Sequence, residues 1–140
     1  MIFWDTSAVV RCYSQGESGR DRALNLLSSK ERHSGSVLLL AETAGAISRQ
    51  AGSNRPLADR AIRKVRDDLA SFELIPTDVA QAEVAARMAF ERRIHGADAI
   101  HIACAWLISR EFRRGFRFVT SDVDQAAAAR SEKLRVILVN

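Results

Sequence analysis

Four acidic residues stand out in this sequence because their neighbours are apolar or small. Asp5 follows the apolar run that opens the chain, and Asp122 follows a second apolar run that ends at Thr120. Glu42 and Asp98 lie in segments rich in alanine, leucine and isoleucine. Most of the other acidic residues lie among arginines, where pairing between residues four positions apart explains them. The four are therefore the first candidates for chemistry.

Each of these carboxylates also has a purely structural explanation. Asp5 and Asp122 suit the N-cap positions of helices that follow them. Asp98 suits the first turn of a helix, where the helix dipole favours a negative charge. Glu42 can pair with an arginine on its own helix, such as Arg49. Each structural explanation is sufficient for its own residue. Only the occurrence of all four carboxylates together points to chemistry.

Predicted strands and helices alternate along the chain. Apolar runs indicate the strands, and apolar residues at helical spacing indicate the helices. Ser36 and Thr77 are the expected N-caps of two helices, and Pro56 suits the first turn of another. The expected strands are 2–5, 33–35, 73–76, 116–120 and 134–139, and the expected helices are 8–14, 20–29, 36–50, 56–72, 77–93, 97–113 and 124–132.

The alternation predicts an α/β fold, a single three-layer α/β/α domain over residues 1–140 with a mainly parallel central sheet. Ligands of such sheets bind outside the carboxyl ends of the strands. Asp5 and Asp122 follow two such ends, and Asp98 begins a helix that is reached through a glycine turn. Glu42 lies on the inward side of an apolar helix. We therefore expect all four carboxylates at one rim of the sheet.

A cluster of carboxylates at one rim points to a divalent cation. The carboxylates repel one another and have raised pKa values unless a cation is present. Hard oxygen ligands suit Mg²⁺ or Mn²⁺, whereas the histidines and cysteines show no spacing typical of zinc. Such cations activate water and stabilise in-line displacement at phosphorus without a protein nucleophile. The sequence contains no nucleophile elbow, Walker A loop or dinucleotide-binding glycine motif.

The composition is that of a globular protein, with 47% hydrophobic and 27% charged residues. No apolar stretch reaches the roughly 18 residues of a membrane span, and the apolar start lacks the basic region of a signal peptide. Two cysteines make no disulfide framework, so the expected compartment is the reducing cytoplasm. The net charge is +4 and all but three of the 21 basic residues are arginine. This balance fits a polyanionic partner, and an arginine-rich source composition explains it equally well.

Four short segments, taken in order, resemble the acidic motifs of the PIN domain family. They are the apolar strand followed by Asp5-Thr6-Ser7, then Leu40-Ala41-Glu42, Asp98-Ala99-Ile100-His101-Ile102-Ala103 and Val119-Thr120-Ser121-Asp122. The match covers the whole chain, through the alanine-rich helix and the apolar last strand. Within the family, the chain most resembles the small VapC-type toxins of bacterial and archaeal toxin–antitoxin pairs.

The resemblance implies a Mg²⁺- or Mn²⁺-dependent endoribonuclease that leaves a 5′-phosphate and a 3′-hydroxyl. It implies a catalytic and metal-binding quartet of Asp5, Glu42, Asp98 and Asp122, with Asp5 and Asp98 as the principal ligands. It also implies an RNA substrate, a cognate antitoxin protein as partner and a homodimer. Ser7 matches a small hydroxyl position that accompanies the quartet in the family.

Further residues receive weaker assignments. Thr120 matches the second small hydroxyl position of the family. Asp124 is an extra acid near the quartet, where it fits the first turn of a helix better than a second metal. Packing is the expected role of His101, Trp4 and Trp106. The arginines that by position are candidates to hold RNA phosphates are Arg11, Arg49, Arg92 and Arg93.

Other functions were weighed against the nuclease. Haloacid-dehalogenase-like phosphatases and receiver domains also begin with a strand that ends in aspartate. The phosphatase is disfavoured because Ser7 stands where it needs its second acid and only Lys30, Lys64 and Lys133 could supply its lysine. The receiver domain is disfavoured because Asp5 lacks a paired acid and Val119-Thr120-Ser121 carries no lysine. Two alternatives stay open. One is a PIN-fold module that binds RNA or protein with little turnover, and the other is a housekeeping RNA-processing nuclease without an antitoxin.

Overall fold

Five strands and seven helices alternate along residues 1–112 and 115–140, which this computed structural model describes. The strands are β1 (Ile2–Trp4), β2 (His33–Ser36), β3 (Glu73–Ile75), β4 (Arg117–Thr120) and β5 (Val136–Leu138). The helices are α1 (Thr6–Tyr13), α2 (Arg20–Leu27), α3 (Leu38–Ala51), α4 (Arg55–Leu69), α5 (Val79–Arg92), α6 (Gly96–Ser109) and α7 (Val123–Ser131). Within these ranges, no helix combines the length and the hydropathy that a membrane crossing needs.

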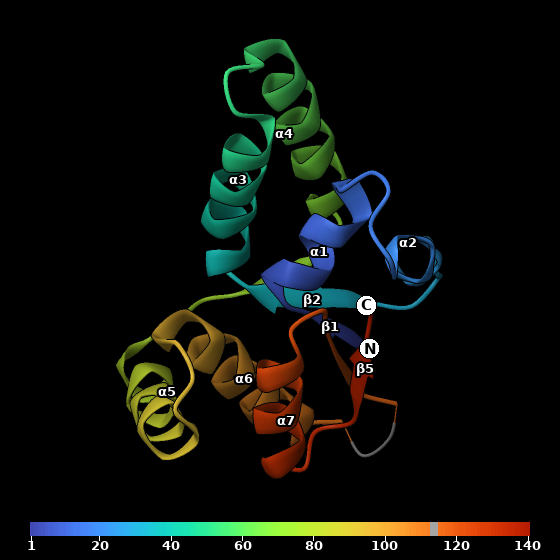
Figure 1. Cartoon of the computed structure of the whole chain (residues 1–140). Coiled ribbons are helices and arrows are strands. Elements are labelled where there is room, and N and C mark those ends of the chain that lie inside the picture. Colours follow the sequence, from blue (N-terminus) through green and yellow to red (C-terminus); the bar gives the residue numbers. More distant parts are fainter. Residues whose placement is uncertain (113–114) are drawn as a thin grey trace.

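The sheet reverses its direction of growth at β1. Its order is β3-β2-β1-β4-β5, and every neighbouring pair is parallel. The chain builds outward from β1 to β3 and then returns to the other side of β1. Because crossover connections are right-handed, this reversal moves the later helices to the opposite face. Figure 1 shows α1–α4 on one face and α5–α7 on the other, which confirms the three-layer α/β/α prediction.

The central strands are apolar on both faces. In β1, Trp4 packs against the layer of α1–α4, whereas Phe3 packs against the layer of α5–α7. In β4, Val119 packs against the layer of α1–α4 and Phe118 against the layer of α5–α7. Side chains that alternate across a buried parallel strand explain this unbroken apolar run. The carboxyl ends of β1 and β4 are therefore neighbours at the point of reversal, where bound ligands are usual in such sheets.

All the predicted strands and helices are present, but one predicted N-cap at the start of α3 is wrong. Ser36 is the last residue of β2, where it pairs in parallel with Ile75. The helix begins at Leu38, and Val37 before it offers no side-chain cap. The Ser36 hydroxyl lies 3.1 Å from His101 Nδ1 in the interior. A serine that the pattern assigns to a helix start thus serves the buried polar contacts of a strand.

The predicted N-cap of α5 is also wrong. Asp78, not Thr77, holds this position, because its carboxylate accepts the Gln81 N–H at 2.9 Å. The Gln81 side chain in turn accepts the Asp78 N–H at 2.8 Å. This capping box satisfies two backbone donors at once, which a threonine one residue earlier cannot do. The helix α6 ends at Ser109, so its predicted extension through residues 110–112 is wrong, and the predicted last residue, Arg113, lies outside the described residues.

The tryptophans and cysteines lie in the interior or against it. Trp4 is fully buried, as predicted for a core residue. Trp106 is partly buried against the α5–α7 layer, and the Arg110 guanidinium lies 5.0 Å over its ring. Cys12 and Cys104 are free and buried in opposite layers.

The loop before α2 gives a test of the packing at the carboxyl end of β5. Gly19 has φ 76°, and a Cβ there would lie 2.6 Å from Asn140 N and 2.7 Å from the Val139 carbonyl carbon. Gly16 has φ 77° but open space around it. We expect Gly16→Ala to cost about 1–2 kcal/mol of unfolding free energy from backbone strain alone. Gly19→Ala should cost about 1–3 kcal/mol more, because buried Val139 cannot move aside.

Urea denaturation of the two variants beside the wild type measures this difference. Equal losses would mean that Gly19 is not packed against the end of β5.

Candidate functional site

The two aspartates at the strand ends cap the helices that follow. Asp5 directly follows β1, and its Oδ2 accepts the Ser7 N–H at 2.8 Å. Asp122 follows β4 by two residues, and its Oδ1 accepts the Gln125 N–H at 2.8 Å. The N-cap explanation of both residues is therefore correct. It does not compete with a role in a site, because the cap itself fixes each carboxylate at the carboxyl end of its strand.

One hollow of about 460 Å³ opens at this rim. The four predicted carboxylates all line it, together with backbone and small side chains of α1 and α3. The complete lining consists of Asp5, Thr6, Ser7, Val10, Ala41, Glu42, Gly45, Ala46, Arg49, Asp98 and Asp122. The reversal of the sheet makes this possible, because α3 and α6 approach the ends of β1 and β4 from opposite faces.

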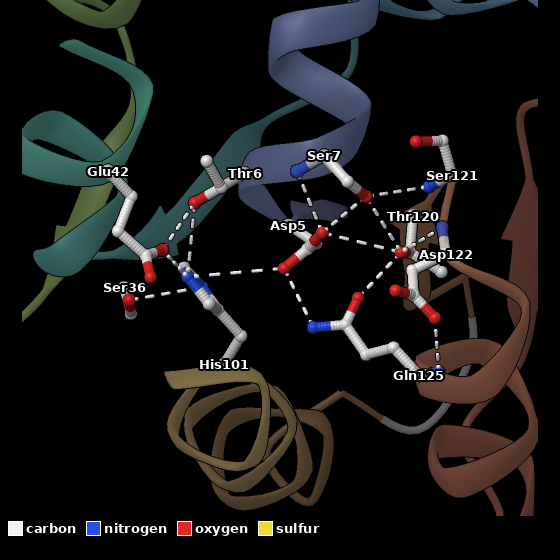
Figure 2. Close-up of polar contacts among 10 residues, drawn as sticks. All are labelled: Asp5, Thr6, Ser7, Ser36, Glu42, His101, Thr120, Ser121, Asp122 and Gln125. Atoms are coloured by element: carbon white, nitrogen blue, oxygen red, sulfur yellow. Dashed lines mark hydrogen bonds and ion pairs between the residues drawn. The ribbon is translucent and has the colours of Figure 1, made fainter. Parts of the chain in front are cut away.

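Asp5 is the best-fixed carboxylate of the four. It is buried, and Figure 2 shows it between two groups of hydrogen-bond donors. Its Oδ2 accepts the Ser7 hydroxyl at 2.6 Å in addition to the Ser7 N–H. Its Oδ1 accepts the Gln125 amide Nε2–H at 2.7 Å. Three donors from two helices thus hold one orientation of this carboxylate.

Gln125 is itself held in place by Thr120. A hydroxyl has one proton to give. The shortest acceptor for the Thr120 hydroxyl is Gln125 Oε1, at 2.6 Å. In turn Thr120 Oγ1 accepts the Asp122 N–H at 3.0 Å. This chain of bonds assigns the amide orientation of Gln125, which is fully buried, and links the ends of β1 and β4 to α7.

Glu42 pairs with His101 and not with Arg49. Its Oε2 lies 2.7 Å from His101 Nε2 and accepts the Thr6 hydroxyl at 2.6 Å (Figure 2). His101 is 1% exposed, and its Nδ1 lies against the Ser36 hydroxyl. The prediction that His101 only packs is therefore wrong. An apolar helix spacing cannot distinguish a buried histidine that packs from one that bonds a carboxylate across the sheet rim.

The Glu42–His101 contact favours the charged form of both partners. Burial opposes the imidazolium, but the hydrogen bond to Glu42 and the charges of Asp5, Glu42 and Asp98 outweigh it, so the pKa of His101 is raised. The hydrogen bond from His101, with a further one from Thr6, holds the pKa of Glu42 below its usual range. The surroundings of His101 thus favour its protonated form, with Glu42 Oε2 at 2.7 Å and Asp5 Oδ1 at 4.0 Å from Nε2.

Within residues 1–112 and 115–140, no side chain donates a hydrogen bond to the Asp98 carboxylate. Burial, together with the negative charges of Asp5 and Asp122, raises the pKa of Asp98 to about 6. Nearby His95 and His101 counteract this rise only in part. The hollow therefore carries more negative charge than its own cations balance.

The donor set fits a hard divalent cation in its chemistry. Oxygen ligands line the hollow, and the raised pKa of Asp98 reports negative charge that a cation would relieve. As the side chains stand, no three Asp, Glu, His or Cys residues in the described ranges form a ready-made metal-binding group. Both oxygens of Asp5, and Oε2 of Glu42, accept hydrogen bonds from side chains or backbone instead.

The other candidate residues lie apart from the quartet or in its supporting contacts. Ser7 supports Asp5, and its Oγ also accepts the Ser121 N–H at 2.9 Å. Asp124 is exposed in the first turn of α7 and lines a different hollow, with Arg92 and Arg93. The expectation that Asp124 belongs to the helix start is consistent with this position.

Sequence reasoning missed Gln125. Its position in an alanine-rich segment gave one usable signal, because a lone amide between Asp124 and a run of alanines must either face solvent or find buried partners. The sequence alone could not decide between these two outcomes.

This chain is similar to a known family and to several solved structures. It matches the PIN domain family over residues 2–131. No curated protein sequence matches it. Among solved structures it is similar to VapC20 of Mycobacterium tuberculosis, a sarcin-ricin-loop-cleaving toxin, with 23% identity over 91% of this chain and 95% of that one and a TM-score of 0.69.

Two further structures show the same fold. The FitAcB structure from Neisseria gonorrhoeae has 19% identity, coverage of 98% of this chain and 96% of that one, and a TM-score of 0.71. VapBC2 from Rickettsia felis, bound to a DNA fragment from its promoter, has 16% identity, full coverage of both chains and a TM-score of 0.67. At these identities the likeness concerns the fold. The family match over nearly the whole length decides the family: this chain belongs to the PIN domain family.

Proposed function

We propose that this protein is a divalent-metal-dependent endoribonuclease, the toxin of a type II toxin–antitoxin pair that acts in the cytoplasm. The observation that carries the proposal is the convergence of Asp5, Glu42, Asp98 and Asp122 on one hollow. Four acids from four parts of the chain meet there, at the reversal point of a PIN fold. A protein that only needed helix caps or surface charge would not concentrate unbalanced negative charge in this way.

Similar structures support the choice of substrate and role. One is described as a toxin that cleaves the sarcin-ricin loop, which is RNA, and another is a VapBC2 assembly on promoter DNA. We extend to this chain an RNA substrate, a cognate antitoxin partner and a homodimeric state. The surplus of arginine and the net charge of +4 suit a polyanionic substrate that must approach an acidic centre.

Asp5, Glu42, Asp98 and Asp122 are the residues that would hold Mg²⁺ or Mn²⁺. When bound, such an ion lowers the pKa of a water molecule and stabilises charge at the phosphorus centre. The supporting residues then decide how the carboxylates are presented.

Each carboxylate has its own task in this proposal. Ser7 and Gln125 hold Asp5 in one orientation, so little conformational entropy is lost there when a ligand binds. Glu42 is half-buried and bonded to His101, and it can turn toward the hollow by giving up that bond. Asp98 is the carboxylate least stabilised as an anion, so a cation benefits it most.

Asp5→Asn should abolish Mn²⁺ binding and RNA cleavage while the protein stays folded. Asparagine still caps a helix, so α1 keeps its N-cap. A 180° turn of the Gln125 amide would present its oxygen to the new Asn amide, so the buried network can be satisfied again. Calorimetry with Mn²⁺ and mapping of RNA cleavage sites, with and without Mg²⁺, measure the two losses.

Asp124→Asn is the matched control, because this acid is exposed and lies outside the hollow of the quartet. It should bind metal and cleave RNA like the wild type. Wild-type protein that binds no divalent metal at millimolar concentration would refute the nuclease and favour a binding module. Cleavage that needs metal but is undiminished by every partner protein encoded beside it would favour a housekeeping nuclease.

Gln125→Leu should weaken Mn²⁺ binding by about 10- to 100-fold, as is typical when a residue that orients a metal ligand is lost. The substitution removes the only donor to Asp5 Oδ1 among the described side chains and leaves the Thr120 hydroxyl without its acceptor. Unfolding free energy should fall by about 1–3 kcal/mol. Calorimetry and urea denaturation separate the two effects. If the variant is destabilised but binds Mn²⁺ with the affinity of the wild type, Gln125 contributes to stability and does not orient Asp5 for metal binding.

A further inference from the structure

Arg49 is the one cation among the described residues that line the acidic hollow. It lies in the last turn of α3, on the helix that also carries Glu42. The nuclease proposal leaves open how an RNA strand is held against four carboxylates that repel it. Arg49 is a candidate to hold that strand, a role that rests on the proposed nuclease function.

The Arg49 side chain folds back along α3 toward the carboxylates. A Cβ built on Gly45 would lie 3.3 Å from Arg49 Nη1, so the guanidinium lies over that glycine. Long side chains in a helix lean toward its N-terminus, which agrees with this direction. Gly45 follows Glu42 by three residues, which is about 4.5 Å along the helix axis. The guanidinium therefore lies about one helical turn from the acid.

The guanidinium of Arg49 is not engaged by a carboxylate. Among the described residues, none lies within 4.0 Å of it, although four carboxylates line the same hollow. Glu42, its neighbour on α3, is bonded to His101 and Thr6 instead. The five N–H donors of Arg49 thus remain available to a ligand.

The other candidate arginines are already in use or lie elsewhere. Arg11 pairs with Glu17. Arg92 donates to Glu132 Oε1 from two nitrogens, at 3.0 and 3.2 Å. Arg93 lines the separate hollow beside α7. Of the four arginines singled out from the sequence, only Arg49 combines a free guanidinium with a place in the wall of the acidic hollow.

We propose that Arg49 forms a phosphate subsite, in which its guanidinium binds the non-bridging oxygens of the RNA phosphate next to the one at the carboxylates. The fork of donors matches two phosphate oxygens, which a lysine ammonium does not. Gly45 provides the room, because a Cβ at this position would lie 3.3 Å from Arg49 Nη1 and would crowd the guanidinium. A cation one turn from the acids supplies the attraction that the acids themselves cannot.

Binding of RNA by three arginine variants tests the subsite. The probe is a short fluorescein-labelled single-stranded oligoribonucleotide that contains one mapped cleavage site, followed by anisotropy in EDTA so that the proposed nuclease does not turn over. Arg49→Ala should bind about tenfold more weakly, and its salt dependence should be shallower by about 0.7, the value for one phosphate contact on a single strand. Arg49→Lys should bind RNA more tightly than Arg49→Ala and more weakly than the wild type, because an ammonium keeps the charge but cannot bind two phosphate oxygens as a fork. Arg60→Ala, an exposed site on α4 outside the hollow, should bind like the wild type.

Neutral methylphosphonate links, placed one at a time, locate the contact on the strand. Neutralising the link next to the cleaved one should weaken binding of the wild type about tenfold and have no further effect in Arg49→Ala. Equal sensitivity of both proteins at every link would overturn the subsite. So would equal losses in Arg49→Ala and Arg60→Ala.

The same measurements separate failure of the subsite from failure of the nuclease proposal. A wild type that cleaves RNA with Mg²⁺, with Arg49→Ala unchanged in affinity and salt dependence, overturns the subsite alone. A wild type that cleaves no RNA with Mg²⁺ overturns the nuclease proposal, and the subsite that rests on it is overturned with it.

Discussion

Mutual repulsion among four carboxylates is the constraint on which the rim of this sheet depends. Each carboxylate is accommodated by a different means. Asp5 accepts three hydrogen bonds, and Glu42 lies against a buried histidine. Asp122 caps α7, where the positive end of the helix dipole favours it. Asp98 keeps a raised pKa, because burial and, after it, the charges of Asp5 and Asp122 disfavour its anion.

The topology of the sheet brings the four carboxylates to one rim and places the helices that carry Glu42 and His101 on opposite faces. Reversal at β1 sends α3 and α6 to opposite faces, so Glu42 and His101 meet across the rim from two different layers. The contact between them joins the two layers beyond the end of the sheet. Its bonds to Thr6 and Ser36 attach it to α1 and to the last residue of β2. A change at this contact therefore acts on the fold and on the site at once.

The sequence predicts the strands, the helices and the four acids well, because these depend on local pattern and on the rule for parallel sheets. Asp5 could be found from one apolar run and its end. His101 and Gln125 could not, since their roles arise only when α6 and α7 pack against residues far away in the chain. Ser36 shows the same limit. Its hydroxyl contacts His101, which lies 65 positions away in the chain, so the local pattern could not show that Ser36 ends a strand instead of capping a helix.

A cap and a role in a site are often treated as alternatives for an aspartate, but each cap here engages only one carboxylate oxygen. Asp122 caps α7 through Oδ1, and within the described residues its Oδ2 accepts no hydrogen bond. Asp5 caps α1 through Oδ2, while Oδ1 accepts only the Gln125 amide, a neutral donor. A cap requires only one carboxylate oxygen, and it fixes the residue at the start of a helix. In these two segments of the parallel sheet, the helix starts beside the end of a strand. The requirement of the helix thus fixes where the second oxygen lies, so the local explanation of these residues is compatible with the proposed metal site.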